Sequence, residues 1–273
     1  MLYGAFCEQF SLATFAAKSS TMNLREGKNA ITRADVQWIK GLRQAGEARK
    51  QGLFVAEGGK IVTTLLEAGL RPERLYVQAE RMDSSYQPYS PTQLSLGEMQ
   101  RLSGMDSAPA ALGVFPIPSF APRAVVDGVT LMLDGVQDPG NLGAIVRTAA
   151  WFGIREVICS AQCARIYTPK AVQGSMGAIA YLPVRYTDLE DELTSWPAEI
   201  PIYAAVMGAT TDYRQVSCAP PCAILLGSEG HGLNPNLLPR VQQQISIPLG
   251  PNGHGESLNV AAAAALLCGW ATR

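Results

Sequence analysis

The second half of the chain alternates short apolar runs with segments of helical periodicity. The runs that predict strands are 129–133, 156–159, 181–184, 202–206, 223–226 and 245–247. The segments that predict helices are 142–152, 169–173 and 258–268. Strands that are apolar throughout are typical of a parallel sheet covered by helices on both faces. The pattern therefore predicts an α/β fold for this half.

The first half has shorter elements and is predicted to form a smaller α/β domain. Thr32 is a good N-cap for a helix that the apolar spacing extends to about residue 46. A second helix is predicted at 60–67, closed by Gly69, and strands at 53–55, 75–77 and 112–115, with a loop at 82–93. Prolines at 116, 118 and 122 indicate a linker. We expect four regions: an extension at 1–28, a small α/β domain at 29–116, a linker at 117–126 and a larger α/β domain at 127–273.

Composition and charge narrow the function classes. Of 273 residues, 47% are hydrophobic and 16% are charged, which argues against disorder. The longest apolar run, 260–268, is too short to span a membrane, so we expect no membrane partner. Residues 1–122 carry 13 basic against 11 acidic residues, while 123–273 carry 9 against 12. A polyanion is therefore expected to contact the N-terminal part, although a solvated helix face explains the same pattern equally well.

The cysteines could suggest a metal site. They lie at 7, 159, 163, 218, 222 and 268, and two pairs have three residues between their members. Because Cys159 and Cys222 lie in apolar, strand-like runs, we interpret them as small buried hydrophobic residues and expect no metal. Scattered cysteines and the lack of a basic segment before the apolar N-terminal stretch favour a reduced, cytoplasmic protein.

The common nucleotide and nucleophile motifs are missing from the sequence. No G-x-G-x-x-G follows a predicted strand, and no G-x-x-x-x-G-K-[ST] occurs, which disfavours a dinucleotide enzyme and a P-loop enzyme. No G-x-S-x-G occurs, and both histidines, His231 and His254, lie in Gly-rich loops. A Ser–His–Asp hydrolase is therefore poorly supported.

Three other segments combine polar side chains with a strand or helix boundary. In the first, 133–149, Asn141 is a good N-cap, and Arg147 follows among small apolar residues as either a salt-bridge partner or an active-site cation. In the second, 224–233, a buried strand leads to Glu229 between glycines that let backbone approach a ligand. In the third, 247–261, Ser257 is a fair N-cap, whereas Asn259 in the first turn is a poor purely structural choice.

Together the three segments resemble motifs of the SpoU family of RNA ribose 2′-O-methyltransferases, within the SPOUT superfamily. The matches are N-x-G-A-I-x-R-T-A, then L-G-S-E-G-x-G, then I-P-L followed by S-L-N-V, in the family's order. The N-terminal part, with F-V-A-E-G at 54–58, is similar to the family's small RNA-binding domain. The resemblance covers roughly residues 29–271. The loop between Leu249 and Ser257 is slightly longer than usual in the family.

The resemblance implies a fold, a cofactor and an assembly. The fold is a parallel sheet with helices on both faces that ends in a C-terminal trefoil knot, and the protein is a homodimer through the knotted domain. S-adenosylmethionine is the implied cofactor, held largely by backbone groups. The implied cofactor-binding residues are Val206, Met207, Gly208, Leu226, Gly227, Ile247, Leu249 and Leu258.

The resemblance also implies site residues and a substrate, an RNA ribose 2′-hydroxyl. The implied catalytic residues are Asn141, Arg147, Glu229, Ser257 and Asn259. Arg147 is expected to hold a phosphate or developing alkoxide charge, because a guanidinium is too basic to accept a proton. The residues expected to contact RNA phosphates are Lys40, Arg43, Arg49 and Lys50. The extra N-terminal domain favours ribosomal RNA over tRNA; a catalytically silent RNA-binding relative and a metabolic enzyme with a nucleotide cofactor are the alternatives.

Overall fold

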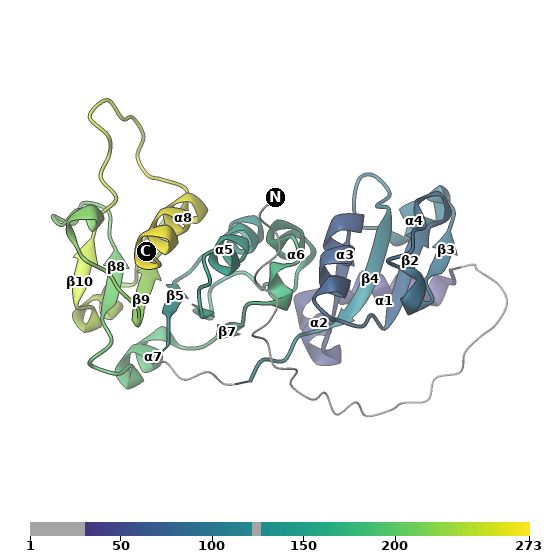
Figure 1. The fold of residues 1–273 in the computed structure, drawn as a ribbon, viewed down its shortest axis with the longest axis horizontal. Coiled ribbons are helices and arrows are strands. Elements are labelled where there is room, and N and C mark those ends of the chain that lie inside the picture. Colours follow the sequence, from purple (N-terminus) through teal and green to yellow (C-terminus); the bar gives the residue numbers. More distant parts are fainter. Residues whose placement is uncertain (1–30, 122–126) are drawn as a thin grey trace.

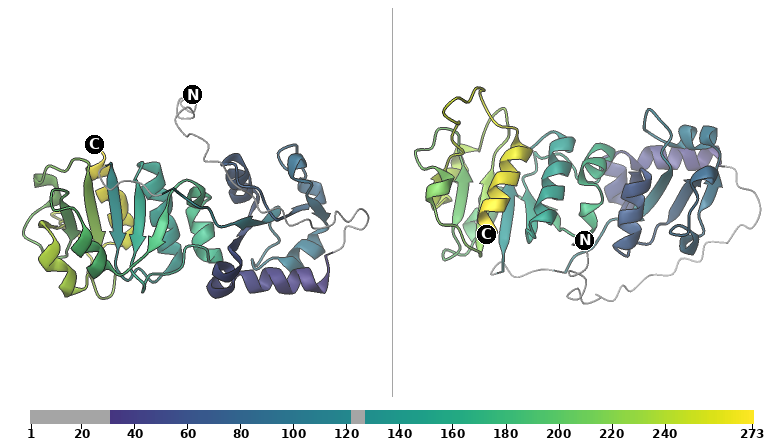
Figure 2. Two further views of the ribbon diagram at one scale, coloured as in Figure 1. Left: turned by 90° about the horizontal axis from the view of Figure 1, so that it is seen from below. Right: turned by 45° about the horizontal axis from the view of Figure 1, so that its top comes forward.

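The computed structural model describes residues 31–121 and 127–273. The predicted extension at 1–28 lies outside these residues, as does the second half of the predicted linker. Figure 1 shows two α/β domains along the long axis, with the N-terminal domain in purple and blue. Figure 2 shows the same side-by-side arrangement from two further directions.

The N-terminal domain is a four-stranded mixed sheet with helices on both faces. Its strands are β1 (Leu53–Glu57), β2 (Arg74–Gln78), β3 (Thr92–Leu94) and β4 (Ala111–Pro116), in the order β1-β4-β2-β3. Its α-helices are α1 (Arg33–Leu42), α2 (Ala45–Gln51), α3 (Gly59–Glu67) and α4 (Leu96–Leu102), with short 3-10 helices at Ala79–Arg81 and Gln87–Tyr89. Successive side chains of β1 point to opposite faces, so Phe54 packs with α3 and Val55 packs with α1 and α4.

The single helix predicted at 32–46 is two helices in the structure. Thr32 does cap α1, and its hydroxyl accepts the Asp35 N–H at 3.1 Å in a reciprocal capping box. The chain then leaves the helical conformation at Gln44, which has extended backbone angles and precedes α2. The apolar spacing continues across this break because both helices bury a side against the same domain.

The C-terminal domain is built on a six-stranded sheet in which every neighbouring pair is parallel. Its strands are β5 (Val129–Leu133), β6 (Glu156–Cys159), β7 (Val184–Tyr186), β8 (Ile202–Ala205), β9 (Cys222–Leu226) and β10 (Gln243–Ile245). Their order is β10-β8-β9-β5-β6-β7. This confirms the predicted parallel α/β sheet. β5 and β6 have the bounds that the apolar runs predict.

Helices cover both faces of this sheet, as predicted. They are α5 (Pro139–Trp151), α6 (Pro169–Ser175), α7 (Leu189–Ser195) and α8 (Val260–Ala271), with 3-10 helices at Ala178–Ala180, Tyr213–Gln215 and Pro235–Arg240. One apolar core joins α5, α6 and α8 to Leu131 and Leu133 of β5. The other face of β5 buries Met132 against α7. Figure 1 shows α5 and α8 side by side over the sheet.

One predicted strand is displaced. The run at 181–184 is apolar, but the strand is Val184–Tyr186 and the residues before it follow a 3-10 turn at Ala178–Ala180. Leu182 is buried in the core without being part of a strand. A short apolar run therefore indicated burial correctly and secondary structure wrongly.

The two domains are in direct apolar contact. Phe54 of β1 and Tyr167, just before α6, have ring centroids 5.2 Å apart. A Cβ placed on Gly177 would lie 2.6 Å from Cγ2 of Thr64, so this contact leaves no room for a side chain. Over the described ranges, no helix is long and apolar enough to cross a membrane. The trefoil knot stays a prediction of the resemblance.

Candidate active site

The predicted cofactor-binding segments all begin at one edge of the large sheet. Leu226 at the end of β9 is in register with Ala205 of β8 and with Leu133 of β5, and Ala205 is in register with Ile245 of β10. The segments that follow these strand ends therefore emerge side by side. In open α/β sheets, ligands bind outside the carboxyl ends of the strands, which is this edge.

A polar cluster joins three of the five predicted catalytic residues at this edge. Oε1 of Glu229 accepts hydrogen bonds from Nδ2 of Asn141 at 3.1 Å, Nδ2 of Asn259 at 2.6 Å and the Val260 N–H at 3.1 Å. Nδ2 of Asn259 also donates to Oδ1 of Asn141 at 3.1 Å. We call Asn141, Glu229 and Asn259 the polar triad. It connects the start of α5, the loop after β9 and the start of α8.

The structure corrects both predicted helix caps at this site. α5 begins at Pro139 with Asp138 as its N-cap, and Oδ1 of Asp138 accepts the Asn141 N–H at 2.8 Å. α8 begins at Val260 with Asn259 as its N-cap, because Oδ1 of Asn259 accepts from the N–H groups of Ala261 and Ala262. Asn141 and Ser257 are therefore not caps. Asn259 has two roles, because its Oδ1 caps the N-terminus of α8 while its Nδ2 donates a hydrogen bond to Glu229.

Asp138 is a supporting residue that the sequence reasoning missed. Its Oδ2 accepts from Nζ of Lys170 at 2.6 Å. That bond, together with the bond from the Asn141 N–H, holds the pKa of the Asp138 carboxyl below its usual range. An Asp directly before a Pro-Gly pair was the available signal, since Pro is favoured in the first helical turn. Asp138 thus fixes the backbone of Asn141 while staying ionised at neutral pH.

The other two predicted catalytic residues lie apart from the triad. Ser257 is exposed and forms no side-chain hydrogen bond within the described residues. Arg147 is exposed on α5, and its guanidinium has no ion pair with any residue of the described ranges. Arg147 and Glu229 form no ion pair, and the Glu229 carboxylate accepts hydrogen bonds from amide groups.

Gly227 is required by the packing of the loop that follows β9. A Cβ on Gly227 would lie 2.2 Å from the carbonyl carbon of Gly232 and 2.5 Å from the Leu233 nitrogen. The hairpin that carries Glu229 therefore folds back directly over Gly227. The hairpin therefore requires a residue without a side chain at this position. The expected contact of Gly227 with the cofactor stays a prediction.

The loops at the strand ends suit a ligand with an apolar ring and polar groups. Met207, Leu249 and Leu258 expose 77%, 64% and 47% of their surface, which is high for large apolar side chains. Within the described residues, the N–H groups of Met207, Gly208 and Ile247 form no hydrogen bond. Apolar cover and unpaired backbone donors fit the adenine ring and the polar groups of S-adenosylmethionine.

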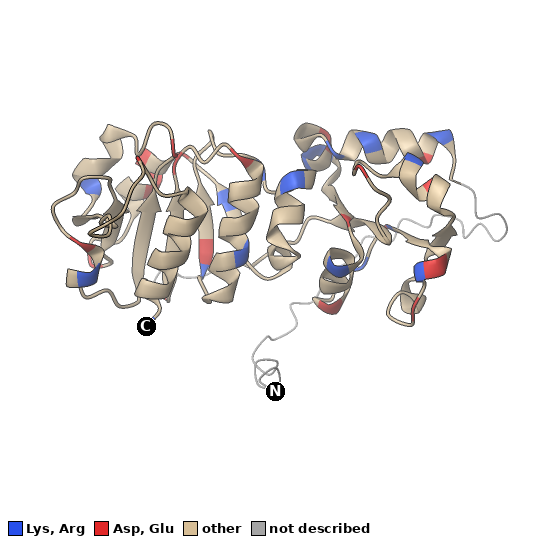
Figure 3. Ribbon diagram, turned by 90° about the horizontal axis from the view of Figure 1, so that it is seen from above, with Lys and Arg blue, Asp and Glu red and all other residues tan. Residues whose placement is uncertain are grey.

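Three of the four predicted RNA-contact residues are exposed. Lys40 lies in the last turn of α1, and Arg49 and Lys50 lie in the last turn of α2. Figure 3 shows basic positions along the helices of the N-terminal domain, whereas α8 carries no charge. Residues 31–121 carry 10 basic against 9 acidic residues and 127–273 carry 8 against 12, so the charge asymmetry of the sequence persists in the described residues.

Arg43 has a structural role instead. Its guanidinium forms an ion pair with Glu57 at 2.9 Å and donates to the Leu102 carbonyl at 2.6 Å. Glu57 is only 8% exposed, and its carboxylate also accepts from the Ser103 hydroxyl and the Gly104 N–H. Arg43 is thus engaged inside its own domain and is less available to a phosphate than the other three residues.

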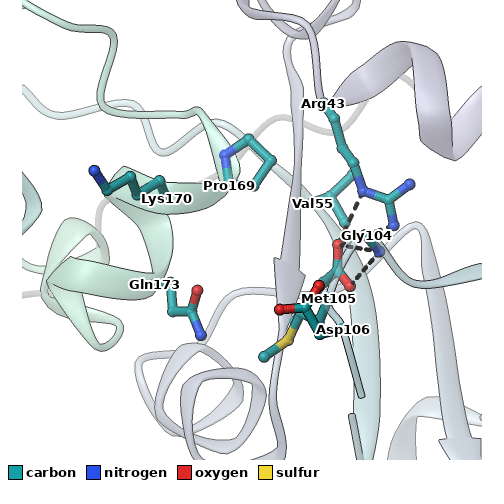
Figure 4. Close-up of a pocket in the computed structure, with 9 residues that line it drawn as sticks. Arg43, Val55, Gly104, Met105, Asp106, Pro169, Lys170 and Gln173 are labelled. Atoms are coloured by element: carbon teal, nitrogen blue, oxygen red, sulfur yellow. Dashed lines mark hydrogen bonds and ion pairs between the residues drawn. The ribbon is translucent and has the colours of Figure 1, made fainter. Parts of the chain in front are cut away.

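This ion pair lines a cleft between the domains. The cleft has a volume of about 410 Å³, and Figure 4 shows Lys170 and Gln173 of α6 across from Arg43.

The described ranges contain no group of three or more side chains arranged to hold a metal ion. Cys159, Cys163, Cys222 and Cys268 are buried, as expected of packing residues, whereas Cys218 is half-buried. Cys7 lies outside the described residues.

Comparisons with known proteins agree with this geometry. The family model described as SpoU rRNA Methylase matches residues 128–269. A 23S rRNA (guanosine(2553)-2′-O)-methyltransferase from Bacillus subtilis is 33% identical over 138 residues, which are 50% of this chain and 55% of that protein. This chain thus aligns with about half the length of that curated relative.

Solved structures are similar over nearly the whole chain. A TrmH-family structure from Porphyromonas gingivalis is 32% identical with a TM-score of 0.77, and the match covers 88% of this chain and 98% of that one. The structure of an AdoMet-bound rRNA methyltransferase from Sinorhizobium meliloti is 25% identical with a TM-score of 0.75, covering 89% and 95%. These comparisons confirm the predicted family: the chain belongs to the SpoU rRNA methylase family of RNA methyltransferases, whose cofactor is S-adenosylmethionine.

Proposed function

We propose that this protein transfers a methyl group from S-adenosylmethionine to a ribose 2′-hydroxyl of RNA. The observation that carries the proposal is the polar triad, held at the carboxyl edge of the sheet beside loops with exposed apolar side chains and unpaired N–H groups. The same chemistry is named for the Bacillus subtilis relative. S-adenosylmethionine supplies an electrophilic methyl group on a sulfonium, so the protein's own residues need to align the hydroxyl and help it lose its proton.

The triad leaves one oxygen for the substrate. Oε1 of Glu229 accepts three hydrogen bonds, whereas Oε2 accepts none within the described residues. The three bonds fix the direction of the carboxylate, and Val260 places it at the positive end of α8. Oε2 is therefore positioned to accept a hydrogen bond from a ribose hydroxyl. Because Glu229 is exposed, an RNA can reach this oxygen.

Arg147 supplies a cation without a competing partner. It projects from α5, the helix that starts beside Asn141, and makes no ion pair in the described part of the chain. A planar guanidinium binds a phosphate through two parallel hydrogen bonds. We therefore assign Arg147 to an RNA phosphate near the reacting ribose. Ser257, two residues before Asn259 and exposed, is assigned to the same ribose as part of this proposal.

A homodimer through the C-terminal domain is part of the proposal. Trp151 at the end of α5 is 78% exposed and Leu266 on the neighbouring helix α8 is 44% exposed. Large apolar side chains on adjacent helices are typical of a protein interface. We expect the wild-type protein to have the mass of a dimer by light scattering and Trp151→Glu to have the mass of a monomer.

Ribosomal RNA is the favoured substrate, with tRNA as the alternative. The support is the additional N-terminal domain, whose Lys40, Arg49 and Lys50 are exposed and form no ion pair in the described ranges. Replacing these three residues by Gln should weaken binding to every RNA and flatten the salt dependence by about one unit of slope per lost phosphate contact. An unchanged slope would identify them as a solvated helix face. RNA modification and free thiols both agree with a cytoplasmic location.

The central experiment is a methyl-transfer assay. Purified protein is mixed with S-adenosylmethionine labelled in the methyl group and with ribosomal RNA or tRNA from cells that lack this protein. We expect label in ribosomal RNA at one nucleotide, resistant to alkaline cleavage as a 2′-O-methyl ribose is. Label on a base would overturn the assignment of the 2′-hydroxyl, and label in tRNA alone would overturn the assignment to ribosomal RNA. Calorimetry without RNA should show S-adenosylmethionine binding, weakened in Leu249→Ala.

A further inference from the structure

The carboxyl edge of the sheet has a second half that the cofactor loops do not occupy. The cofactor loops follow β8, β9 and β10, whereas a separate hollow lies over β9, β5 and β6. The hollow has a volume of about 320 Å³. Its lining residues include Asp134, Gln137, Gln162, Ser228, His231 and Asn234. The loop after β9 is shared, so Glu229 lies between the two halves.

Several hydrogen bonds give the hollow a fixed shape. Ser228 and Gly232 exchange two backbone hydrogen bonds of 3.0 Å, which close the hairpin that carries Glu229 and His231. The Asn234 N–H donates to Oδ2 of Asp134 at 2.8 Å and ties the end of that hairpin to the loop after β5. A preformed hollow loses little entropy when a ligand enters it.

The lining offers neutral hydrogen-bonding groups. The side chains of Gln137, Gln162 and His231 are exposed and form no hydrogen bond within the described residues. Each of the two amides presents a donor and an acceptor, and a neutral imidazole presents one of each. Asp134 is the one charged lining residue, and it is negative. Such a surface disfavours a phosphate and suits a flat, uncharged heterocycle.

The chemistry of a nucleotide explains why such a group belongs here. The base and the 2′-hydroxyl are attached to adjacent carbons of the ribose. When the hydroxyl lies at Oε2 of Glu229, the base of that nucleotide therefore lies within a few ångströms of the hairpin. Enzymes that modify RNA at single-stranded sites read an unstacked base through hydrogen bonds to its edge.

We propose that this hollow binds the base of the nucleotide whose ribose is methylated, and that Gln137, Gln162 and His231 read its edge. The inference rests on the proposed methyl transfer to a ribose hydroxyl. It divides the site into a methyl-donor half over β10 and β8, a base half over β5 and β6, and the polar triad between them.

The test is a double-mutant cycle between the protein and the RNA. The protein arm is Gln137→Ala/Gln162→Ala/His231→Ala, and the RNA arm is a transcript of the mapped target site with an abasic target nucleotide. We expect the triple variant to lower kcat/KM roughly 100-fold on the intact transcript, from about three- to tenfold for each lost contact. On the abasic transcript, which the wild type methylates roughly 100-fold less well, the triple variant should match the wild type within about threefold.

The controls separate the base site from general damage. Gln93→Ala, an exposed glutamine on β3 of the other domain, should behave as the wild type on both transcripts. Affinity for S-adenosylmethionine in calorimetry should be unchanged in the triple variant. If the variant loses activity equally on intact and abasic transcripts, the hollow does not bind the base, while methyl transfer by the wild type stands. A wild type that methylates no RNA would overturn the proposed function and this inference together.

Discussion

Two glutamates of this protein have similar sequence surroundings and very different environments. Glu57 ends strand β1 and precedes a glycine; Glu229 follows strand β9 and precedes a glycine. Glu57 is 8% exposed, and both of its oxygens accept hydrogen bonds, with the Arg43 guanidinium among the donors. Glu229 is exposed and bound through one oxygen by neutral donors. A carboxylate with every acceptor position filled stabilises the fold, whereas one held by a single oxygen can act on a ligand.

The largest effect that this comparison predicts is on the stability of Glu57→Ala. The substitution leaves the Arg43 charge in a mostly buried site without its counter-ion, which costs about 3–5 kcal/mol of unfolding free energy. Urea denaturation of the full chain, followed by circular dichroism, measures this loss. The double variant Arg43→Ala/Glu57→Ala should recover part of it because no unpaired charge remains. A loss of about 1 kcal/mol or less in the single variant, as for an exposed pair, would contradict the structural role.

The second effect, on Glu229→Gln, concerns activity rather than stability. The glutamine keeps an oxygen for Asn259 and Val260 but loses the charge on the oxygen that we propose accepts the ribose hydroxyl. We expect methyl transfer to fall about 100-fold or more, with a change of about 1 kcal/mol or less in unfolding free energy. Single-turnover transfer to the mapped RNA gives the first value and urea denaturation the second.

A control for Glu229→Gln is available. Glu199→Gln removes an exposed carboxylate that precedes the amino end of β8, at the opposite edge of the sheet from the strand-end loops, and should change neither quantity. If Glu229→Gln instead unfolds easily and whatever remains folded is fully active, then Glu229 resembles Glu57 and the comparison fails.

The smallest effect concerns Asp138, a carboxylate intermediate between the two. It is exposed like Glu229 but has both oxygens engaged like Glu57. Because its folded pKa lies below the usual value, it stabilises the fold above that value and loses the contribution as pH falls through the folded pKa. We therefore expect the melting temperature of the wild type to fall more below about pH 4 than that of Asp138→Asn. At neutral pH the two should agree within about 0.5 kcal/mol, because Asn also caps a helix and the exposed ion pair contributes little.

Much of the fold could be predicted because apolar side chains tend to be buried, so the pattern of apolar residues indicates which segments face the core. Uniform apolar runs identified β5 and β6 with correct bounds, and the Thr32 capping motif identified the start of α1. The prediction failed where a buried apolar residue is not part of a strand: Leu182, predicted to lie in a strand, is buried in the bend before β7. Helix α7 was missed although Asp188 caps it and its first turn is acidic, because its apolar residues are few.

The sequence predicted which residues gather at the site but not which hydrogen bonds they form with one another. The motifs named Asn141, Glu229 and Asn259, yet which side chain caps a helix and which one binds its neighbour depends on distances across the fold. Asn141 and Ser257 were plausible caps by residue type, and the caps are Asp138 and Asn259. The same difficulty applies to the predicted RNA-contact residues. Charge alone grouped Arg43 with Lys40, and only the structure shows that Arg43 is paired with Glu57. Local patterns in a single sequence do not show which residues far apart in the chain form hydrogen bonds or ion pairs with each other.

The wide spacing of the polar triad along the chain has a consequence for folding. Asn141 and Glu229 are 88 residues apart and Asn141 and Asn259 are 118 apart, so the triad forms only when the whole C-terminal domain has assembled. Contacts of such separation form late and slowly in a folding chain. A nascent chain lacking α8 therefore has no triad and cannot bind its ligands through it. Bound ligand would select the finished domain, and raising its concentration a hundredfold above the dissociation constant would stabilise that domain by about 2.7 kcal/mol against unfolding.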